Sequence, residues 1–487
     1  MKKLVLLILS VFVYMLQIDC NKTDEEIKEI PITTNSEEAL NHFIKGRDLW
    51  ENMHIPEAAL ILDSAVMKDS SFAMAYYYLA YSQNDVTKLI EYLNKAKSHV
   101  DKISEGEKLF ILGINEELNN RYGEAREIYK KLVVLFPGDK RAHGQLAWHY
   151  YRGGEFQSAI DSYKKAFEID SNFAPTYNMI GYCYSNLDNF NEAEIALKKY
   201  SELMPDEANP HDSYAEILMK QGKFDESIKE YQKALSIDPN FSVSFIGLGT
   251  DFVFKGNYEK GREQFQKLLD APYDDGYRTI AYESLAYSYI FENKYHDAIN
   301  ELQKAYDLAK MNEDFTGMSG YISMIGDILL EYGKHDEARK KYLNALELIQ
   351  NSRTAPEELK IEAKKTFLLD EAFVALKKSE IAVAKDKAED YLKQTLKSNN
   401  PREIKVYHGL SGMIALYEKR YDNAVNELLQ ANQRNPRILF KIAEAYEDLG
   451  NKEKAKEFFL KTANFNEIST NYAFVRNKAF KKLEEYK

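Results

Sequence analysis

The chain has 487 residues, with 65 basic against 77 acidic side chains and a formal net charge of −12. Glycine (22) and proline (11) are scarce while helix-forming residues are abundant, so the composition favours an all-α protein. An acidic protein does not attract phosphate backbones or anionic lipid surfaces, which excludes nucleic acid as an expected partner.

The N-terminal residues have the organisation of an export signal. Two lysines precede an apolar stretch over residues 4–18, which is short for a membrane-spanning helix, and Cys20 follows. This arrangement resembles a bacterial lipoprotein signal, although Asp19 stands where such signals usually carry Gly, Ala or Ser. The resemblance implies removal of residues 1–19, lipidation of Cys20 and a membrane-anchored place in the bacterial envelope, facing the periplasm or the cell surface. An uncleaved anchor and a secreted or periplasmic soluble protein remain the alternatives.

Removal of residues 1–19 leaves 63 basic against 76 acidic residues, a net charge of −13. The chain has two cysteines, Cys20 and Cys183, so lipidation of the first excludes an internal disulfide. Residues 20–36 are polar and show no hydrophobic period, which predicts a tether between the anchor and the folded protein.

A period of 34 residues runs through the middle of the chain. Each repeat carries two small residues 12 positions apart, where two antiparallel helices can approach closely. The first small residues are Gly113, Ala147, Gly181, Ala215 and Gly249, and the second are Ala125, Ala159, Ala193, Ser227 and Gly261. Large apolar residues at helical spacing around them predict one buried stripe on each helix.

The turn between the two helices of each repeat has its own signal. The seventh residue after the first small one must end a helix, often in the left-handed conformation that Gly, Asn and Asp adopt most readily. The five residues at this position are Asn120, Gly154, Asp188, Gly222 and Gly256. Prolines at 137, 205 and 239 then fall where the second helix must stop.

These residues resemble the tetratricopeptide repeat, whose pattern is seen in Ile180, Gly181, Tyr184, Ala193, Leu197 and Pro205. The resemblance implies an all-α, right-handed superhelical α-solenoid of about twelve helical hairpins. Fainter copies pair Gly46 with Ala58, Ala286 with Ala298, Gly326 with Ala338, Gly412 with Ala424, and Ala443 with Ala455. Met53 and Lys419 depart from the turn rule.

The repeats divide the chain into three regions after the tether. Residues 37–349 are expected to form the main array, residues 350–400 a divergent helical region, and residues 401–487 the last repeats with a capping helix. Wider spacing between 249 and 326 predicts longer second helices and connections, and a provisional hairpin is placed on Ala372 and Ala384. The capping helix is expected to turn Phe474, Phe480 and Leu483 inward.

No group of residues predicts catalysis. Gly222 with Lys223 lacks the rest of a phosphate-binding loop, and Gly409 to Gly412 lacks the strand and final glycine of a nucleophile elbow. No two histidines lie four apart on a helix as metal ligands would, and Cys183 is interpreted as an inert core residue. We expect no enzyme activity, no cofactor and no metal.

In the tetratricopeptide family the first helices line a concave groove that receives a peptide or partner helix, and helical phase places seven residues there. They are Arg141, Trp148, Tyr151, Asn178, Tyr182, Asp212 and Glu216. Aromatic and arginine side chains are common where proteins bind proteins, although an aromatic at helical spacing often packs against the next hairpin instead. The chaperone-binding members use a basic cluster, which the two acidic residues here exclude.

The sequence therefore predicts a non-catalytic scaffold that binds a partner protein or peptide in its groove and is anchored to a bacterial envelope. A glycan-binding or nutrient-binding surface lipoprotein is the alternative, because related uptake lipoproteins use such repeats. An enzyme with a site in residues 350–400 is a third hypothesis. The identity of the partner does not follow from these residues.

Overall fold

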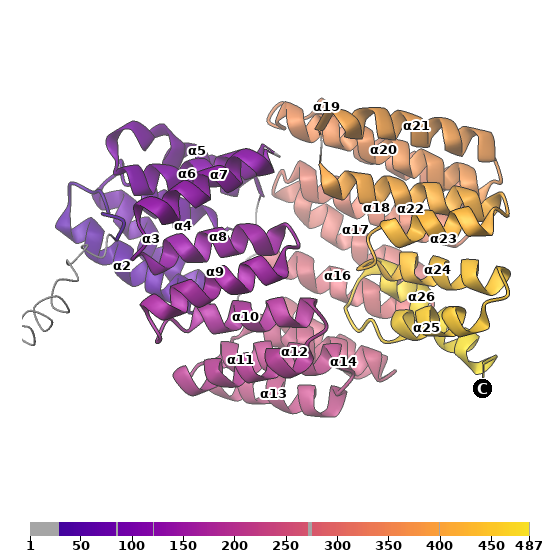
Figure 1. Cartoon of the computed structure of the whole chain (residues 1–487), viewed down its shortest axis with the longest axis horizontal. Coiled ribbons are helices and arrows are strands. Elements are labelled where there is room, and N and C mark those ends of the chain that lie inside the picture. Colours follow the sequence, from indigo (N-terminus) through magenta and orange to yellow (C-terminus); the bar gives the residue numbers. More distant parts are fainter. Residues whose placement is uncertain (1–28, 84–85, 120, 271–274, 399, 487) are drawn as a thin grey trace, which may run out of the picture. The chain divides into compact units, whose positions relative to one another are not determined.

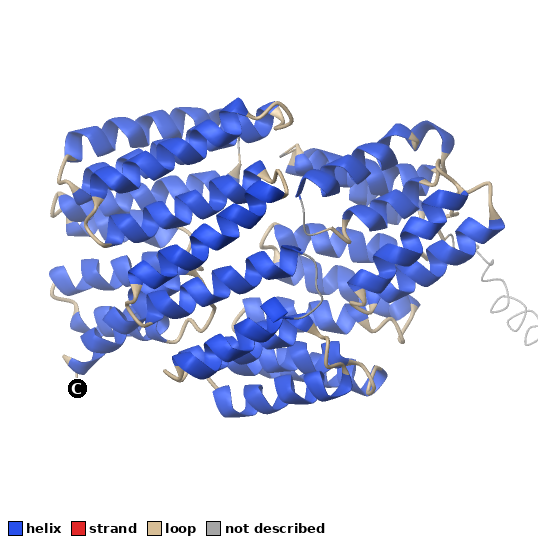
Figure 2. Ribbon diagram, turned by 180° about the vertical axis from the view of Figure 1, so that it is seen from behind, coloured by secondary structure: helices blue, strands red, loops and turns tan. Residues whose placement is uncertain are grey.

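The computed structural model describes residues 29–83, 86–119, 121–270, 275–398 and 400–486. These residues form 25 α-helices and one short 3-10 helix, and they contain no strand (Figure 2). The predicted signal peptide and Cys20 lie outside the described residues. Among the helices described, none is both long and apolar enough to cross a bilayer.

The chain divides into two compact units. The N-terminal unit holds residues up to 188 except 83–89, and the C-terminal unit holds residues 189–487 together with 83–89. The helices up to residue 188 are α2 (Glu37–Glu51), α3 (Ile55–Lys68), α4 (Ala73–Ala80), α5 (Val86–Ser98), η1 (Val100–Lys102), α6 (Glu105–Leu118), α7 (Tyr122–Leu135), α8 (Lys140–Arg152), α9 (Phe156–Ile169) and α10 (Pro175–Asn186).

The C-terminal unit continues the series with α11 (Phe190–Leu203), α12 (Ala208–Lys220), α13 (Phe224–Ile237), α14 (Ser242–Phe254), α15 (Tyr258–Asp270), α16 (Asp275–Phe291), α17 (Tyr295–Met311), α18 (Phe315–Glu331), α19 (His335–Asn351), α20 (Glu357–Lys377), α21 (Ile381–Ser398), α22 (Pro401–Tyr417), α23 (Tyr421–Gln430), α24 (Pro436–Asp448), α25 (Lys452–Ala463) and α26 (Thr470–Glu484).

The helices from α2 to α25 follow one another as twelve consecutive pairs, with α26 at the end (Figure 1). Within each unit, sequence neighbours such as α8 with α9 and α18 with α19 pack side by side. The predicted array of about twelve helical hairpins with a terminal helix is therefore confirmed.

The helices of a hairpin touch where the small residues lie. A Cβ atom added to Gly249 of α14 would stand 2.4 Å from the ring of Phe265 on α15, and one added to Gly261 would stand 2.8 Å from the Gly249 carbonyl oxygen. Phe265 is fully buried, so its ring has no room to move away. In the preceding hairpin, Ser227 Oγ donates a hydrogen bond to the Ala215 carbonyl at 2.7 Å.

The turns between paired helices repeat one backbone conformation. Gly154, Gly222 and Gly256 have φ values of 77°, 75° and 78°, and Asp188 has 56°, as the sequence predicts. Met53 and Lys419, which depart from the sequence rule, adopt the same left-handed conformation with φ of 67° and 60°. Packing of the hairpin therefore imposes this turn even on residues that favour it poorly. Asn120 lies outside the described residues.

The predicted lengthening of second helices after residue 249 is seen in α17 and α19, but the first helices lengthen as well. The four helices α16 to α19 each have 17 residues, against 13 in α14 and in α15, so first and second helices both lengthen. The divergent region forms the pair α20 and α21, of 21 and 18 residues. Ala372 and Ala384 are fully buried in it, which supports the provisional hairpin.

The segment before α2 is bound to the N-terminal unit, which corrects the tether predicted over residues 20–36. Ile30 N donates to Asp139 Oδ2 at 2.9 Å, Thr33 N donates to Glu107 Oε1 at 2.9 Å, and Ser104 Oγ donates to the Pro31 carbonyl. These contacts fix residues 30–33 across the N-terminal ends of α6 and α8. Residues 20–28 lie outside the described part of the chain.

The terminal helix α26 caps the array, with one correction. Phe474 is buried and Leu483 is half-buried, but Phe480, predicted to point inward, is 42% exposed. The reason is that α26 packs against α16 as well as against α24 and α25, so a different set of its residues faces the protein.

Substitution of Gly249 by Ala tests the close approach of paired helices. The new methyl group would overlap the buried Phe265 ring, so we expect the free energy of unfolding to fall by about 1–3 kcal/mol. Gly320 lies within α18 with open space around its added Cβ, and Gly320→Ala should instead stabilise slightly. Chemical denaturation of both variants measures the difference, and equal effects would contradict the packing argument.

Candidate partner-binding surface

The first helix α8 carries the centre of the predicted site. Its N-terminus is fixed by Asp139, whose carboxylate accepts the N–H groups of Arg141 (2.8 Å), Ala142 (3.0 Å) and Ile30. Residues such as Leu146 and Ala147 form the buried side of this helix. The opposite side carries one stripe of residues at helical spacing, which are Arg141, Gly144, Trp148 and Tyr151.

Two aromatic side chains stack on this stripe. The rings of Trp148 and Tyr151 lie 5.4 Å apart and are nearly parallel, at 15°, and Trp148 remains 36% exposed. The next first helix, α10, joins them through Asn186, whose Nδ2 donates to Tyr151 Oη (3.3 Å) and to the Tyr182 carbonyl (2.8 Å). The structure therefore stacks Trp148 on Tyr151 and links Tyr151 to α10 through Asn186, whereas for Tyr182 it is the backbone carbonyl that Asn186 contacts.

Asn178 lies one turn before Tyr182 on α10. Its Oδ1 atom is buried and accepts no hydrogen bond from the described residues. A buried acceptor without a donor is costly, but the same burial keeps this atom out of reach of a ligand on the surface.

Gly144 was not singled out from the sequence, yet it adds to this surface. It sits within α8 one turn before Trp148, and a Cβ added to it would meet nothing within 4 Å. Glycine in a helix interior costs roughly 0.5–1 kcal/mol relative to Ala. Since no packing explains this cost, the bare backbone beside Trp148 is open to close approach by another chain. The sequence could have indicated Gly144 as a surface residue, because it lies 34 positions before Asn178 and therefore occupies the equivalent place in its repeat.

Arg141 is used inside the protein. Its Nε donates to Glu51 Oε1 at 2.6 Å and its Nη2 donates to Glu51 Oε2 at 3.0 Å, which is a two-pronged ion pair between α8 and α2. The sequence predicted an arginine available to a ligand, but the distant partner on α2 could not be seen in it. The ion pair therefore joins two hairpins within the N-terminal unit.

Asp212 and Glu216 belong to the C-terminal unit and also differ from the expectation. Asp212 is 9% exposed and accepts a hydrogen bond from Ser244 Oγ on α14 at 2.6 Å. Burial raises the pKa of Asp212 to about 7, against the opposing effect of the Ser244 hydrogen bond. Glu216 pairs with Lys220 one turn along α12, at 2.8 Å. Neither residue presents a free carboxylate.

A second buried carboxyl, Asp251 on α14, has no hydrogen-bond partner among the described residues for either oxygen. Burial raises the pKa of Asp251 to about 8, with Ser227 acting in the opposite direction. The carboxyl is therefore mainly protonated near neutral pH. Burial of this carboxyl without a hydrogen bond lowers the stability of the C-terminal unit. Because the group is fully buried, it cannot act as a general acid on a substrate.

His149 and Cys183, two side chains with possible reactivity, are both buried. His149 Nδ1 lies 2.5 Å from Glu117 Oε1, and Arg152 donates to the other oxygen of Glu117 at 2.6 Å, so this histidine belongs to a buried polar network. Cys183 is fully buried, and burial raises the pKa of its thiol to about 12. No group of three or more candidate metal ligands occurs in the part of the chain described.

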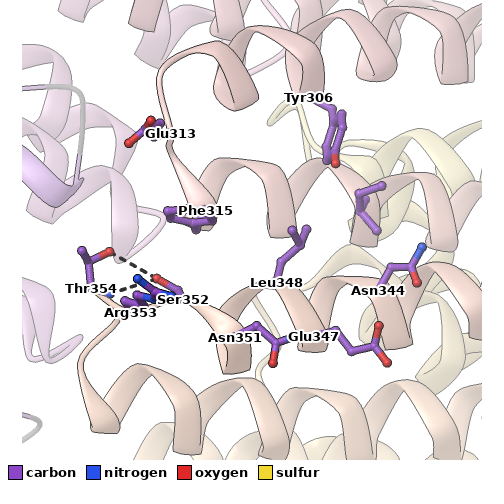
Figure 3. A pocket seen from close by; sticks show the side chains of 11 residues that line it. Tyr306, Glu313, Phe315, Asn344, Glu347, Leu348, Asn351, Ser352, Arg353 and Thr354 are labelled. Atoms are coloured by element: carbon purple, nitrogen blue, oxygen red, sulfur yellow. Dashed lines mark hydrogen bonds between the residues drawn. The ribbon is translucent and has the colours of Figure 1, made fainter.

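One open hollow of about 610 Å³ lies in the C-terminal unit, formed by α17, the start of α18 and the end of α19 (Figure 3). Tyr306, Phe315 and Leu348 give it apolar walls, and the side chains of Asn344, Glu347 and Asn351 stand beside them. Ser352 Oγ accepts the backbone N–H of Thr354 and of Ala355 at its edge, which shapes the connection into α20. An aromatic wall next to amide and carboxylate groups is suited to a small polar ligand.

Comparison with known proteins agrees with the hairpin architecture. Tetratricopeptide repeat family models match residues 115–172, 174–207 and 436–464, a TPR repeat model matches residues 215–250, and a tetratricopeptide repeat-like domain matches residues 246–366. The chain belongs to the tetratricopeptide repeat family.

Among individual relatives, TPR repeat-containing protein YpiA of Bacillus subtilis is 24% identical over 369 residues, which cover 69% of this chain and 83% of that protein. TPR repeat-containing protein MJ1428 of Methanocaldococcus jannaschii is 25% identical over 269 residues, and the chain spans 46% of its length. A tetratricopeptide repeat protein structure from Parabacteroides merdae has 15% identity and a TM-score of 0.36 and covers 56% of this chain and 94% of that one.

The pH dependence of stability tests the buried carboxyl of Asp251. Between about pH 4 and pH 8 the folded chain holds a proton there that the unfolded chain has lost, so the free energy of unfolding should fall as the pH rises through this range. Asp251→Asn removes the titrating carboxyl and with it this pH-dependent decrease in the free energy of unfolding. It should stabilise the protein at pH 8 by more than about 1 kcal/mol.

Thermal or urea unfolding of wild type and Asp251→Asn at pH 5 and pH 8 measures the effect. Asp206→Asn, at an exposed position, serves as the control. A stability difference between Asp251→Asn and wild type that is the same at both pH values would contradict the proposed protonation.

Proposed function

We propose that the protein is a non-catalytic scaffold that binds a partner protein or peptide at the surface formed by α8 and α10. The observation that carries this proposal is Trp148, which stacks on Tyr151 and is still more than a third exposed, beside the bare backbone of Gly144. Large rigid aromatic side chains contribute most of the binding energy in many protein interfaces. Membership of a family whose repeats commonly bind proteins supports the same reading.

The chemistry of the surface favours a peptide or loop in extended form. Such a segment can approach the helix closely where Gly144 has no side chain. The neighbouring Arg141 is already neutralised by Glu51, so charge gives this surface little selectivity. We therefore propose recognition through aromatic contacts and hydrogen bonds, without cofactor or metal.

Two substitutions on α8 test this surface. Trp148→Ala should weaken partner binding by about 2 kcal/mol, roughly 30-fold, with little effect on folding. Gly144→Ala should stabilise the helix by about 0.5–1 kcal/mol and yet weaken binding, because its methyl group would stand between backbone and ligand. A variant that is more stable but binds less well cannot be explained by damage to the fold.

The measurement is binding of residues 29–487 to peptide arrays and to envelope-protein extracts, with Tyr332→Ala as the control because Tyr332 is an exposed aromatic, 62% exposed, in the other unit. Retention that is the same in wild type, Trp148→Ala and Gly144→Ala would contradict the proposal.

Glycan or nutrient binding is the second candidate, favoured by the hollow beside Tyr306 and Phe315 (Figure 3). Aromatic faces next to amide and carboxylate groups are suited to sugar rings and hydroxyls. Saturable oligosaccharide binding that survives Trp148→Ala and is lost in Tyr306→Ala would support this alternative over the scaffold.

We also propose that the chain is exported and anchored to a bacterial envelope through a lipid on Cys20. The support is the apolar stretch that precedes this cysteine. Ile30, the first of the described residues with a hydrogen bond to the folded unit, lies ten residues after Cys20, so an anchored N-terminal unit would stand within about 35 Å of the membrane.

Cys20→Ser tests the anchor. The wild-type chain expressed in a bacterium should incorporate a labelled fatty acid and sediment with membranes, whereas Cys20→Ser should lose the label. Cys183→Ser is the matched control, because that thiol is buried. Absence of label in the wild-type chain would refute lipidation.

A further inference from the structure

The terminal helix α26 lies inside the C-terminal unit, between α16 and α24 (Figure 1). It follows α25 after a short non-helical connection, residues 464–469. Five of its apolar side chains are almost fully buried, although the helix stands at the end of the chain: Tyr472, Ala473, Phe474, Val475 and Ala479. A helix that only capped the last hairpin would bury one face against α25 alone.

Side chains of this terminal segment bind the carboxyl ends of three successive first helices. Asn466 Nδ2 donates to the Lys220 carbonyl of α12 at 3.3 Å. Arg476 Nη2 donates to the Phe254 carbonyl of α14, and Asn477 Nδ2 donates to the Phe291 carbonyl of α16, both at 2.9 Å. Carbonyls in a last helical turn lack intrahelical partners and carry the negative end of the helix dipole, so these three form a row of acceptors.

Arg476 is the centre of this interaction. It is 9% exposed and, among the described residues, pairs with no carboxylate. Its guanidinium instead donates from Nε to Tyr472 Oη at 3.1 Å and lies over the rings of Phe254 (5.3 Å) and Phe480 (5.0 Å). The site therefore compensates a buried cation with helix carbonyls and aromatic faces.

The apolar part of the site is equally specific. The Tyr472 ring packs edge-on against Phe254 and Phe291, with centroids 5.6 and 5.8 Å apart. These two rings come from successive first helices, so Tyr472 fills the space between two hairpins. Tyr472 and Arg476 are four residues apart, which places both on one face of α26.

The rim of the site also favours positive charge. Glu331, at the end of α18, contacts Arg437 of α24 at 2.7 Å, Lys377 of α20 at 3.3 Å and Lys478 of α26 at 3.5 Å. Although burial opposes it, these cations lower the pKa of Glu331 to about 2, so the carboxylate stays ionised. Lys478 of α26 thus satisfies part of an existing negative charge.

We propose that this face of the C-terminal unit is a helix-binding site and that α26 is its resident occupant. The external ligand that fits it is a cationic amphipathic helix from a partner protein, with an aromatic residue and an arginine four residues apart on one face. Such a partner helix displaces α26 from the terminal carbonyls of α14 and α16. This site is separate from the α8 and α10 surface and does not depend on it.

The test weakens the resident helix in the full chain. Arg476→Ala with Asn477→Ala removes two of the three carbonyl contacts, and a fluorescent peptide of residues 464–486 is then added. We expect saturable binding at least about tenfold tighter than to the wild-type chain, in which tethered α26 competes at a high effective concentration. The same peptide with Arg476→Ala should bind at least about tenfold more weakly.

A folded double variant that binds neither peptide, or that binds both peptides equally, would overturn the proposal. A concentration-dependent dimer of the wild-type chain in sedimentation would also overturn the assignment to a foreign helix, because it would identify a second copy as the occupant.

Hydrogen exchange on the wild-type chain keeps the proposal testable if the double variant does not fold. Displacement requires α26 to open locally, so its amides should exchange faster than those of α14 and α16, to which it binds. Exchange of α26 at the same rate as α14, by unfolding of the whole unit, would make α26 part of the core and overturn its role as a displaceable ligand.

Discussion

The close contact between paired helices at small residues is the constraint on which the rest of this structure depends. At Gly249 and Gly261 the backbones approach so nearly that a single added methyl group would overlap a neighbouring ring or carbonyl. Because large side chains such as Phe265 fill the space around that contact, each hairpin has one fixed geometry. The repeated left-handed turns then return the chain in the same way each time, including at Met53 and Lys419.

This repetition places the equivalent residues of successive first helices side by side, and the protein uses much of that surface for itself. In the N-terminal unit, Arg141 reaches back to Glu51 and joins the fourth hairpin to the first. In the C-terminal unit, Asp212 accepts a hydrogen bond from Ser244 of the next first helix. Asn466 contacts the carboxyl end of α12, and α26 contacts those of α14 and α16. In the stripe around Trp148, by contrast, the indole ring stacks on Tyr151 and remains 36% exposed.

One buried position of the repeat is occupied by side chains of very different polarity. The equivalent position in four successive first helices holds His149, Cys183, Ile217 and Asp251, all of them buried. His149 is compensated by Glu117 and Ile217 needs no partner, whereas Asp251 is left without a hydrogen bond. A shared backbone geometry therefore accepts different chemistry at one place, provided that the side chain fits or changes its protonation.

The sequence by itself determined the hairpins, their number and most of their turns. These depend on contacts within one repeat, such as Ala215 with Ser227, whose spacing is fixed by helix geometry and repeats along the chain. Helical phase also placed Trp148 and Tyr151 on one side of α8, where their rings stack. Only the tertiary structure decided which of the remaining site residues are available. The ion pair of Arg141 with Glu51 joins residues 90 positions apart, and the contact of Arg476 with Phe254 joins residues 222 apart. No local period encodes such pairs, since they form only when many hairpins have stacked and the terminal helix has returned to meet them.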